Sequence, residues 1–277
     1  MAQAKPESRG LTWMRTLTGS DGVVAQGPLT VRVADGIVGG MQARFIAVVP
    51  DPLSRFPRAR SGEVGLDEGW ALAHAVRATM TADDHSTRRP IVAVVDVSSQ
   101  AYGRYEELLG IHLACAAAAD AYAAARLAGH VVVGLLVGSA MSGAFLAHGY
   151  QANRLLALDS PGVIVHAMGK LAAARITRRS IEELENLGQL QTPMAYDIRA
   201  YAKLGLLHGL IAGVNADKPG RADVQLVHHE IAAAIADVLS SSAPRDLATR
   251  LSSSSSQKLR AASLAVRQRL REQWDES

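Results

Sequence analysis

Small residues gather where an apolar run ends, in the segment 131–149 (VVVGLLVGSAMSGAFLAHG). Gly138, Ser139, Ser142 and Gly143 stand between this run and a helical pattern. Either the backbone packs closely there, or a ligand approaches its N–H groups. The N–H groups in the first turn of a helix have no internal partner and carry partial positive charge. Such a helix start suits an anionic oxygen, so the chemistry to expect is stabilisation of an oxyanion.

A second segment of the same kind follows the apolar run 91–97 and reads SSQAYGRYEE. The carboxyl ends of strands in a parallel α/β sheet are where ligands bind, so the two segments are expected to form one site. Gly103 and Gly143 would let a ligand come close to the backbone. A purely structural role stays open for both segments, because Gly and Ser are also ordinary turn and cap residues.

The usual side-chain chemistries lack their patterns in this sequence. Neither Ser139 nor Ser142 lies in a Gly-x-Ser-x-Gly nucleophile elbow. Gly169-Lys170 is not part of a P-loop, and no dinucleotide fingerprint follows a strand. The histidines are dispersed, so we expect no metal site. What remains is a reaction that needs an oxyanion hole and no nucleophile, such as loss of CO2 from a malonyl thioester, where each backbone donor contributes about 3–4 kcal/mol.

The composition predicts a protein with a sizeable core that binds neither nucleic acid nor a membrane. Of its 277 residues 48% are hydrophobic, and the formal charge of +3 is too mild to indicate nucleic acid. The single Cys115 excludes an internal disulfide. The longest apolar region, 110–137, is broken by charged residues, and the first residues lack a signal-peptide core. We therefore expect a cytoplasmic protein.

The pattern of apolar residues predicts alternating strands and helices, hence an α/β fold with mostly parallel pairing. Strands are expected at 45–49, 91–97 and 131–137, and helices at 66–82 and 105–127. We expect the helix at 105–127 to be buried all round, because it is small or apolar on almost every side. In the helix at 66–82, the inward-facing residues are expected to be Trp70, Leu72, Ala73 and Val76.

The second half of the chain reads as more helical. Two short strands are expected on either side of a turn at 160–162. Ser180 and Glu183 predict a capping box at the start of a helix. This helix is expected to continue after Pro193 to about residue 211. Another helix is expected at 222–239. We therefore divide the chain into a domain at 1–240 and a tail at 241–277, in which a Ser-rich linker precedes a basic amphipathic helix.

Long stretches resemble the gamma subunits of biotin-independent malonate decarboxylase, in the crotonase-like carboxyltransferase group. They lie at 45–73, 90–114, 138–170 and 193–207, within about Arg9 to Gly213, and the tail after Ser240 falls outside them. The resemblance implies a crotonase-like (ClpP/crotonase) spiral of ββα units with C-terminal helices.

The resemblance also implies an activity and partners. Together with a homologous beta subunit, in a heterodimer or a higher oligomer, the chain would decarboxylate malonyl-S-acyl carrier protein to acetyl-S-acyl carrier protein and CO2. The acyl carrier protein (delta) subunit would carry the malonyl group on a phosphoribosyl-dephospho-CoA prosthetic group, and an alpha transferase subunit would reload it. This chain itself would bind no cofactor. Two alternatives stay open: a carboxyltransferase half that passes CO2 to biotin, and a non-catalytic scaffold for the beta subunit.

The resemblance assigns oxyanion donors residue by residue. Ser142, Gly143 and Ala144 match the Gly-rich segment that supplies N–H groups in related carboxyltransferase subunits, and Gly103 with Tyr102 matches the second loop. Met141 stands where biotin-dependent relatives tend to carry glycine, which agrees with a biotin-independent enzyme. The residues implied to bind the substrate or the prosthetic group are Ser139, Met141, Gln100, Ala101, His166 and Lys170.

Several of these side chains also have an ordinary structural interpretation. As site residues, His166 and Lys170 would hydrogen-bond the carboxylate or the phosphates of the prosthetic group. As a structural residue, His166 would be a satisfied core histidine. Glu106 and Glu107 are typical partners of a helix dipole. The loop arginines either grip phosphates of the prosthetic arm, contact the beta subunit, or are solvated; these are Arg55, Arg58 and Arg60.

Overall fold

The computed structural model describes residues 7–23, 27–84, 88–243, 245–247, 250 and 254–275. It has an α/β fold built on a seven-stranded sheet in the order β1-β2-β3-β4-β5-β7, with β6 paired to the end of β4. The strands are β1 (Val31–Val38), β2 (Met41–Val48), β3 (Ile91–Val97), β4 (Val132–Met141), β5 (Arg154–Leu158), β6 (Ile164–His166) and β7 (Gly209–Ile211). β1 pairs antiparallel with β2, and the other pairs are parallel, as the alternation of strands and helices predicts.

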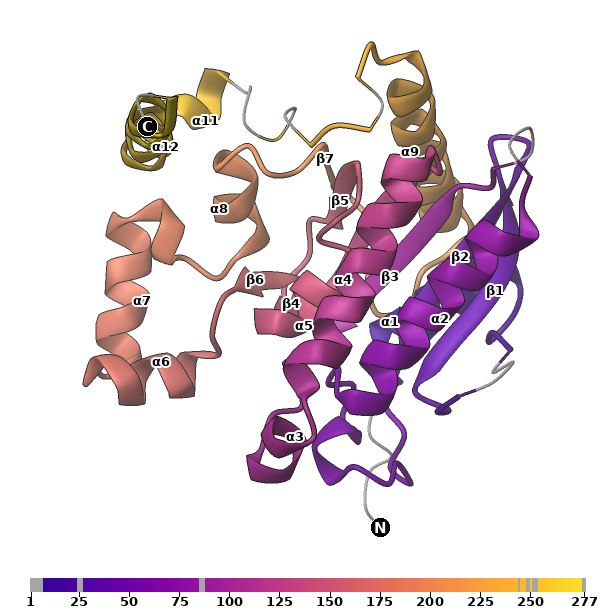
Figure 1. Ribbon diagram of the computed structural model, residues 1–277, viewed down its shortest axis with the longest axis horizontal. Coiled ribbons are helices and arrows are strands. Elements are labelled where there is room, and N and C mark those ends of the chain that lie inside the picture. The colour runs from indigo at the N-terminus through magenta and orange to yellow at the C-terminus, as the bar shows by residue number, and fades with distance from the viewer. Residues whose placement is uncertain are drawn as a thin grey trace.

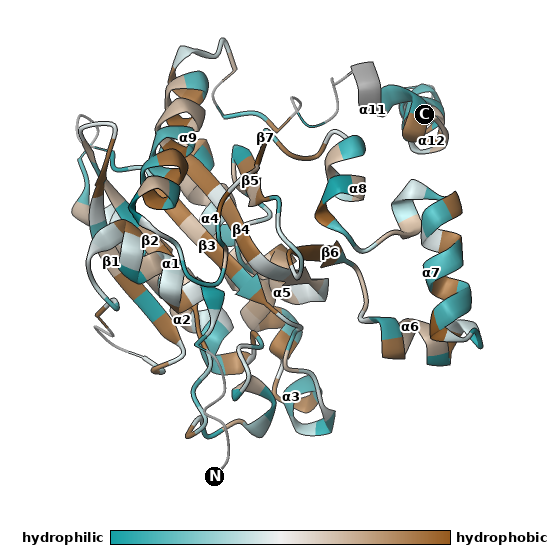
Figure 2. Ribbon diagram, turned by 180° about the vertical axis from the view of Figure 1, so that it is seen from behind, coloured by the Kyte–Doolittle hydropathy of each residue, from teal (hydrophilic) through white to brown (hydrophobic). Residues whose placement is uncertain are grey.

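Helices cover both faces of this sheet. The helices are α1 (Arg9–Thr18), α2 (Leu66–Ala82), α3 (Arg104–Leu108), α4 (Ile111–Ala128), α5 (Ser142–Ala147), α6 (Lys170–Thr177), α7 (Ile181–Leu190), α8 (Ile198–Lys203), α9 (Arg221–Ser240), α11 (Ser254–Leu259) and α12 (Ala261–Asp275), with 3-10 turns at Pro57–Ala59 (η1) and Thr192–Met194 (η2). α2 and α4 lie together on the face in front in Figure 1, and α1 and α9 cover the opposite face, in front in Figure 2. β3 and β4 are therefore buried on both sides, which explains their unbroken apolar sequences.

A second group of helices stands beside the sheet rather than on it. Beyond β6 the chain leaves the sheet edge and forms α6, α7 and α8, and α11 and α12 lie next to α8 (Figure 1). We call these five helices the lateral lobe. α12 has no buried residue. Across the described ranges, no helix is long and apolar enough to cross a membrane.

Several sequence predictions are confirmed to the residue. The helix expected at 66–82 is α2 and the strand expected at 91–97 is β3. The capping box of α7 is present: the Glu183 N–H donates to Ser180 Oγ (3.0 Å), and the Ser180 N–H donates to a Glu183 carboxylate oxygen (2.7 Å). The helix expected at 222–239 is α9, which is one residue longer at each end, and the predicted tail helix is α12, which begins later than expected.

The helix expected at 105–127 is wrong in two respects. It is split into α3 and α4 at Gly110, whose φ of 84° is left-handed and interrupts a right-handed helix. α4 is also buried on one face only, with Leu113 57% exposed, because no described part of this chain covers its outer side. For the same reason Trp70 of α2, expected to face inward, is 52% exposed, whereas Leu72 is fully buried.

Other boundaries also differ. The strand expected at 131–137 extends as β4 to Met141, since its end pairs with β6 and with Val97 of β3. The helix expected to continue after Pro193 is instead η2, α8 and β7, and α11 lies inside the predicted linker. α1 and β1 were not predicted from the sequence, and β2 begins before the strand predicted at 45–49.

Candidate functional site

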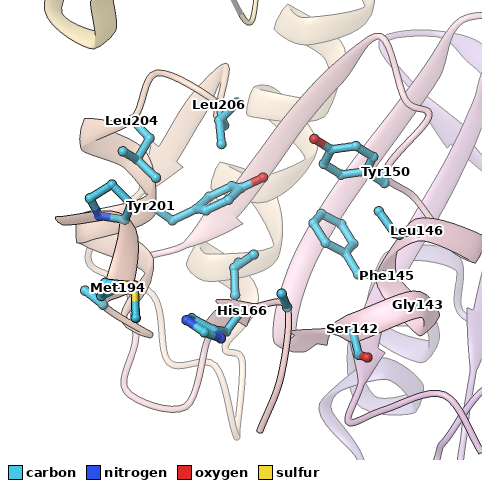
Figure 3. A pocket seen from close by; sticks show the side chains of 14 residues that line it. Ser142, Gly143, Phe145, Leu146, Tyr150, His166, Met194, Tyr201, Leu204 and Leu206 are labelled. Atoms are coloured by element: carbon cyan, nitrogen blue, oxygen red, sulfur yellow. The ribbon is translucent and has the colours of Figure 1, made fainter. Parts of the chain in front are cut away.

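A cavity of about 530 Å³ lies at the carboxyl end of β4, between α5 and the lateral lobe (Figure 3). Of the predicted site residues, Ser142, Gly143 and His166 line it. The rest of the wall is mostly apolar and comes from Phe145, Leu146, Tyr150, Val165, Ala167, Pro193, Met194, Ala195, Tyr201, Leu204 and Leu206. This volume and this lining are typical of a small-molecule site.

The start of α5 has a strained backbone. Ser142 has a φ of 59°, the left-handed region that non-glycine residues rarely adopt. Met141, at the N-cap position, is buried and gives α5 no side-chain cap, so the first-turn N–H groups depend on other partners. Such outliers persist where the surrounding structure holds them, and they gather at functional sites.

Gln100 connects the two predicted segments. A β-carbon placed on Gly143 would lie 2.0 Å from Oε1 of Gln100, so a larger residue there would have to displace the end of this side chain. The Ser142 hydroxyl lies 3.5 Å from the same oxygen. The loop after β3 and the start of α5 are therefore neighbours, as the sequence predicts.

The remainder of the loop after β3 does not reach the cavity. The Ala101 N–H donates to the carbonyl of Val64 (2.8 Å) and the Tyr102 N–H to the carbonyl of Gln100 (2.9 Å). Both groups are thus engaged by the protein itself. Gly103 is the N-cap of α3, and a β-carbon there would lie 2.4 Å from Oε2 of Glu106.

The inner part of the small-residue segment has a packing role. Asp96 accepts hydrogen bonds from the N–H groups of Ser139 (3.1 Å) and Gly10 (3.2 Å), which ties α1 to β4. A β-carbon on Gly138 would lie 2.0 Å from the Asp96 carboxylate. Gly138 and Ser139 therefore lie within β4 rather than at a helix start, and the N–H group of Ser139 is occupied.

His166 enters the cavity wall as a neutral ring. It stacks on Tyr196 with the ring centres 3.9 Å apart, and its Nδ1 lies 3.0 Å from the carbonyl of Met168 and 3.2 Å from the N–H of that residue. Burial lowers the pKa of His166 below its ordinary value, so the ring is mainly uncharged at neutral pH. It can accept or donate a hydrogen bond but brings no positive charge.

The charged candidates lie outside the cavity. Lys170 forms an ion pair with Glu185 (2.6 Å). Arg55 binds the Asp67 carboxylate through two nitrogens, and Arg60 donates to the carbonyl of Ser54. Over the part of the chain that the structure describes, no group of three or more His, Cys, Asp or Glu residues is placed to hold a metal ion.

Sequence reasoning missed the cavity walls. Tyr150 follows α5 and Tyr201 belongs to α8, and both line the cavity together with Leu204 and Leu206. Such residues are ordinary core types, and no motif marks them. Tyr201, Leu204 and Leu206 stand after Pro193, in a segment that was wrongly predicted as continuous helix, so their position at the cavity could not be predicted.

Comparisons with known proteins agree with this architecture. The family model of the malonate decarboxylase gamma subunit matches residues 59–274, so the tail that the sequence analysis left outside the resemblance lies within the family pattern. A chain of a Pseudomonas malonate decarboxylase hetero-tetramer, solved in complex with coenzyme A, is 57% identical with a TM-score of 0.90, covering 96% of this chain and 100% of that one. A chain of the Pseudomonas MdcD-MdcE hetero-dimer is 56% identical with a TM-score of 0.87, with the same coverage of 96% and 100%.

More distant relatives belong to carboxyltransferases. The malonyl-S-ACP:biotin-protein carboxyltransferase MADD of Malonomonas rubra is 37% identical over 165 residues, which cover 58% of this chain and 56% of that protein. This chain thus matches little more than half the length of that relative. A transcarboxylase 12S chain, 21% identical with a TM-score of 0.55, covers 75% of this chain and 35% of its own length and shares the fold alone. The crotonase-like carboxyltransferase fold predicted from sequence is confirmed.

Proposed function

This chain belongs to the malonate decarboxylase gamma-subunit family, and from this premise we propose that it works with a beta subunit to decarboxylate malonyl-S-acyl carrier protein. The products are acetyl-S-acyl carrier protein and CO2. The solved relatives form a hetero-dimer and a hetero-tetramer, which supports a hetero-oligomer here. Exposed apolar side chains on α3 support it as well, since Tyr105 is 76% and Leu108 74% exposed.

The observation that carries the proposal is the position of the strained start of α5 at the cavity wall. When CO2 leaves, the electrons of the broken C–C bond form an enolate whose charge rests on the thioester oxygen. N–H groups of Ser142, Gly143 and Ala144, in the first turn of α5, are the donors that we propose for this oxygen. The carbon of the enolate then takes up a proton, which yields the acetyl group.

Of the second predicted pair, Gly103 with Tyr102, only Gly103 is kept as a proposed donor, because the Tyr102 N–H donates to the carbonyl of Gln100. Among the described residues none accepts a hydrogen bond from the Gly103 N–H, which leaves it available to a ligand. Because Gly103 is not part of the cavity lining, it can act only on a ligand that extends beyond the cavity.

The cavity fits the acyl end of a carrier-bound substrate better than phosphates. Its described lining contains no Lys or Arg, and Lys170 lies outside it, paired with Glu185. Phosphate groups of a phosphoribosyl-dephospho-CoA arm would need cationic or N–H partners there. We therefore assign the cavity to the acyl thioester and leave the phosphates outside it.

The test is CO2 release from malonyl-carrier protein by this chain copurified with its beta subunit, comparing wild type with Gly143→Val. The valine displaces Gln100 and blocks the approach to the α5 N–H groups, so we expect activity to fall about a hundredfold or more while the complex still assembles. Gly169→Val is the matched control, because a β-carbon at Gly169 meets no atom within 4 Å. If Gly143→Val assembles and turns over normally, Gly143 is only a packing glycine, and the donors lie at Gly103 or in the beta subunit.

Carboxyl transfer to biotin is the second candidate, because the Malonomonas rubra relative is named as a biotin-protein carboxyltransferase. The same assay separates the two reactions when avidin is added. Decarboxylation by the proposed route is insensitive to avidin, whereas a route through biotin stops.

A further inference from the structure

Two buried arginines hold the turn that follows α5. Arg250 donates to the carbonyls of Tyr150 (2.7 Å) and Ala152. Arg126 of α4 donates to the carbonyl of Gln151 (3.1 Å), and both arginines are only 8% exposed. Of the three residues whose carbonyls are bound in this way, Tyr150 lines the cavity and the other two do not. The two arginines therefore hold the same turn, but only Arg250 is bonded to the cavity wall.

Arg250 also contacts the side chain of Tyr150. Its guanidinium lies over the Tyr150 ring, 5.2 Å from the ring centre, in the geometry of a cation–π contact. The Tyr150 ring packs against Phe145 as well, with the ring centres 5.2 Å apart and the ring planes at 77° (Figure 3). Arg250 thus fixes both the backbone and the ring of Tyr150.

Arg250 is a buried cation in a segment that the sequence analysis assigned to a Ser-rich linker. Burial lowers the pKa of Arg250, and within the described ranges no carboxylate is paired with it. Burying an unpaired charge is costly, and an apolar side chain would fill the same space without that cost. The cost is offset here by the hydrogen bonds and the ring contact that hold Tyr150.

We propose that Arg250 is a positioning residue for substrate binding, which keeps the Tyr150 ring in place in the cavity wall so that the wall fits the acyl thioester. The inference rests on the proposed function, because it takes this cavity as the place where the acyl thioester binds. Arg250 does not itself line the cavity, and its contacts lie beyond the far end of α5 from the proposed donors. Its loss should therefore weaken binding of the substrate and of the transition state alike, which raises KM and leaves kcat unchanged.

The test is steady-state CO2 release from malonyl-carrier protein by the copurified complex with its beta subunit. Arg250→Met removes the charge and the donors but keeps a long side chain, and we expect KM to rise about five- to tenfold while kcat stays within about twofold. Arg250→Lys keeps the charge and one donor group, so its KM should lie between the two. If Arg250→Met fails to assemble, Arg250→Lys carries the comparison.

Arg126→Met is the matched control. Arg126 is as buried as Arg250 and holds the same turn, but through Gln151, which is not part of the cavity lining. Arg126→Met should therefore destabilise the fold as Arg250→Met does and keep the wild-type KM.

A double variant shows whether Arg250 acts through Tyr150. Tyr150→Leu removes the ring and should by itself raise KM by a similar factor. Adding Arg250→Met to Tyr150→Leu should then change KM by less than about twofold, because the ring that Arg250 holds is already absent. Two independent effects would multiply instead.

Hydrogen exchange of the substrate-free complex gives a readout that needs no turnover. The Tyr150 N–H donates to the carbonyl of Phe145 (3.1 Å) and the Ala152 N–H to that of Gly149 (3.0 Å), and Arg250→Met should speed the exchange of both amides. Unchanged exchange, an equal rise of KM in Arg126→Met, or multiplying effects in the double variant overturns the inference. A complex that releases no CO2 refutes the proposed function, and the exchange rates still decide whether Arg250 holds Tyr150.

Discussion

The two ends of α5 differ in almost every physical respect. At its start, Ser142 is left-handed, no side chain caps the helix, and the cavity lies alongside. At its end, His148 is fully buried, with Nε2 3.0 Å from the carbonyl of Val94 and Nδ1 3.0 Å from the hydroxyl of Tyr122. Because a carbonyl only accepts, Nε2 carries the proton and Tyr122 donates to Nδ1.

This difference shows how a short helix can keep an unsatisfied end in place. A helix of this length has little stability of its own, so its geometry must come from tertiary contacts. The hydrogen bonds of His148 hold the far end rigidly in the core. The strained end at the cavity can then keep its N–H groups in position without being capped.

The largest expected effect is a pH-dependent loss of folding stability caused by His148 at the buried end of α5. Burial lowers the pKa of His148 to about 4, whereas an unfolded histidine titrates near 6.5. Between these values the unfolded chain binds the proton and the native chain does not, so stability is fully present above about pH 6.5 and falls as the pH is lowered toward 4. We expect His148 to contribute a loss of about 3 kcal/mol, measured by urea unfolding at successive pH values.

His148→Gln is the control for this prediction, since it removes the titrating ring while keeping a side chain able to hydrogen-bond. Wild type and variant share all their carboxylates, so subtracting the two curves isolates His148. The difference should change by about 1.4 kcal/mol per pH unit around pH 5. Parallel curves would mean that the core end of α5 does not bury a neutral imidazole.

A smaller effect on the free energy of unfolding is expected when either of two glycines, Gly138 or Gly143, is replaced by alanine. A β-carbon at Gly138 meets Asp96, which is held by the N–H groups of Ser139 and Gly10, whereas one at Gly143 meets the flexible end of Gln100. We expect Gly138→Ala to lower the free energy of unfolding by about 2 kcal/mol through overpacking, and Gly143→Ala by less than about 1 kcal/mol. Urea titrations of both variants measure this; equal losses would show that Gln100 is anchored as firmly as Asp96.

The fold could be predicted where the signal is local. β3 is apolar on both faces and α2 lies between clear turn residues, so both were predicted to the residue. The interruption between α3 and α4 at Gly110 could not be predicted, because the sequence around it favours a helix on both sides. Trp70 and Leu113 were mispredicted for another reason: no described part of this chain covers the side of α2 and α4 on which they lie.

The candidate site could be predicted only in part for a similar reason. Small residues after β3 and β4 correctly indicated that these two segments lie at the same edge of the sheet, where the structure places Gln100 against Gly143. The same signal could not separate Gly138, which makes room for Asp96, from Gly143 at the cavity. Tyr201 stands far along the chain in α8, and only the folded lateral lobe brings it opposite Tyr150.

The smallest expected effect is a gain in stability when the backbone strain at Ser142, at the start of α5, is relieved. Ser142 and Arg178 are the non-glycine residues with left-handed φ in the described ranges, at 59° and 55°. Replacing either by glycine relieves about 1–2 kcal/mol of backbone strain and loses part of that gain to the greater freedom of the unfolded chain. We expect a net stabilisation of about 0.5–1 kcal/mol in both, measured by thermal unfolding.

The two variants should differ, however, in their rate of CO2 release. Arg178 is the C-cap of α6 and lies outside the cavity lining, so Arg178→Gly should keep CO2 release at the wild-type rate. Ser142→Gly frees the backbone that aims the α5 N–H groups, so its activity should fall several-fold although its stability rises. A stability gain with unchanged activity in Ser142→Gly would mean that the strain at this end of α5 is a by-product of packing rather than a condition for binding the oxyanion.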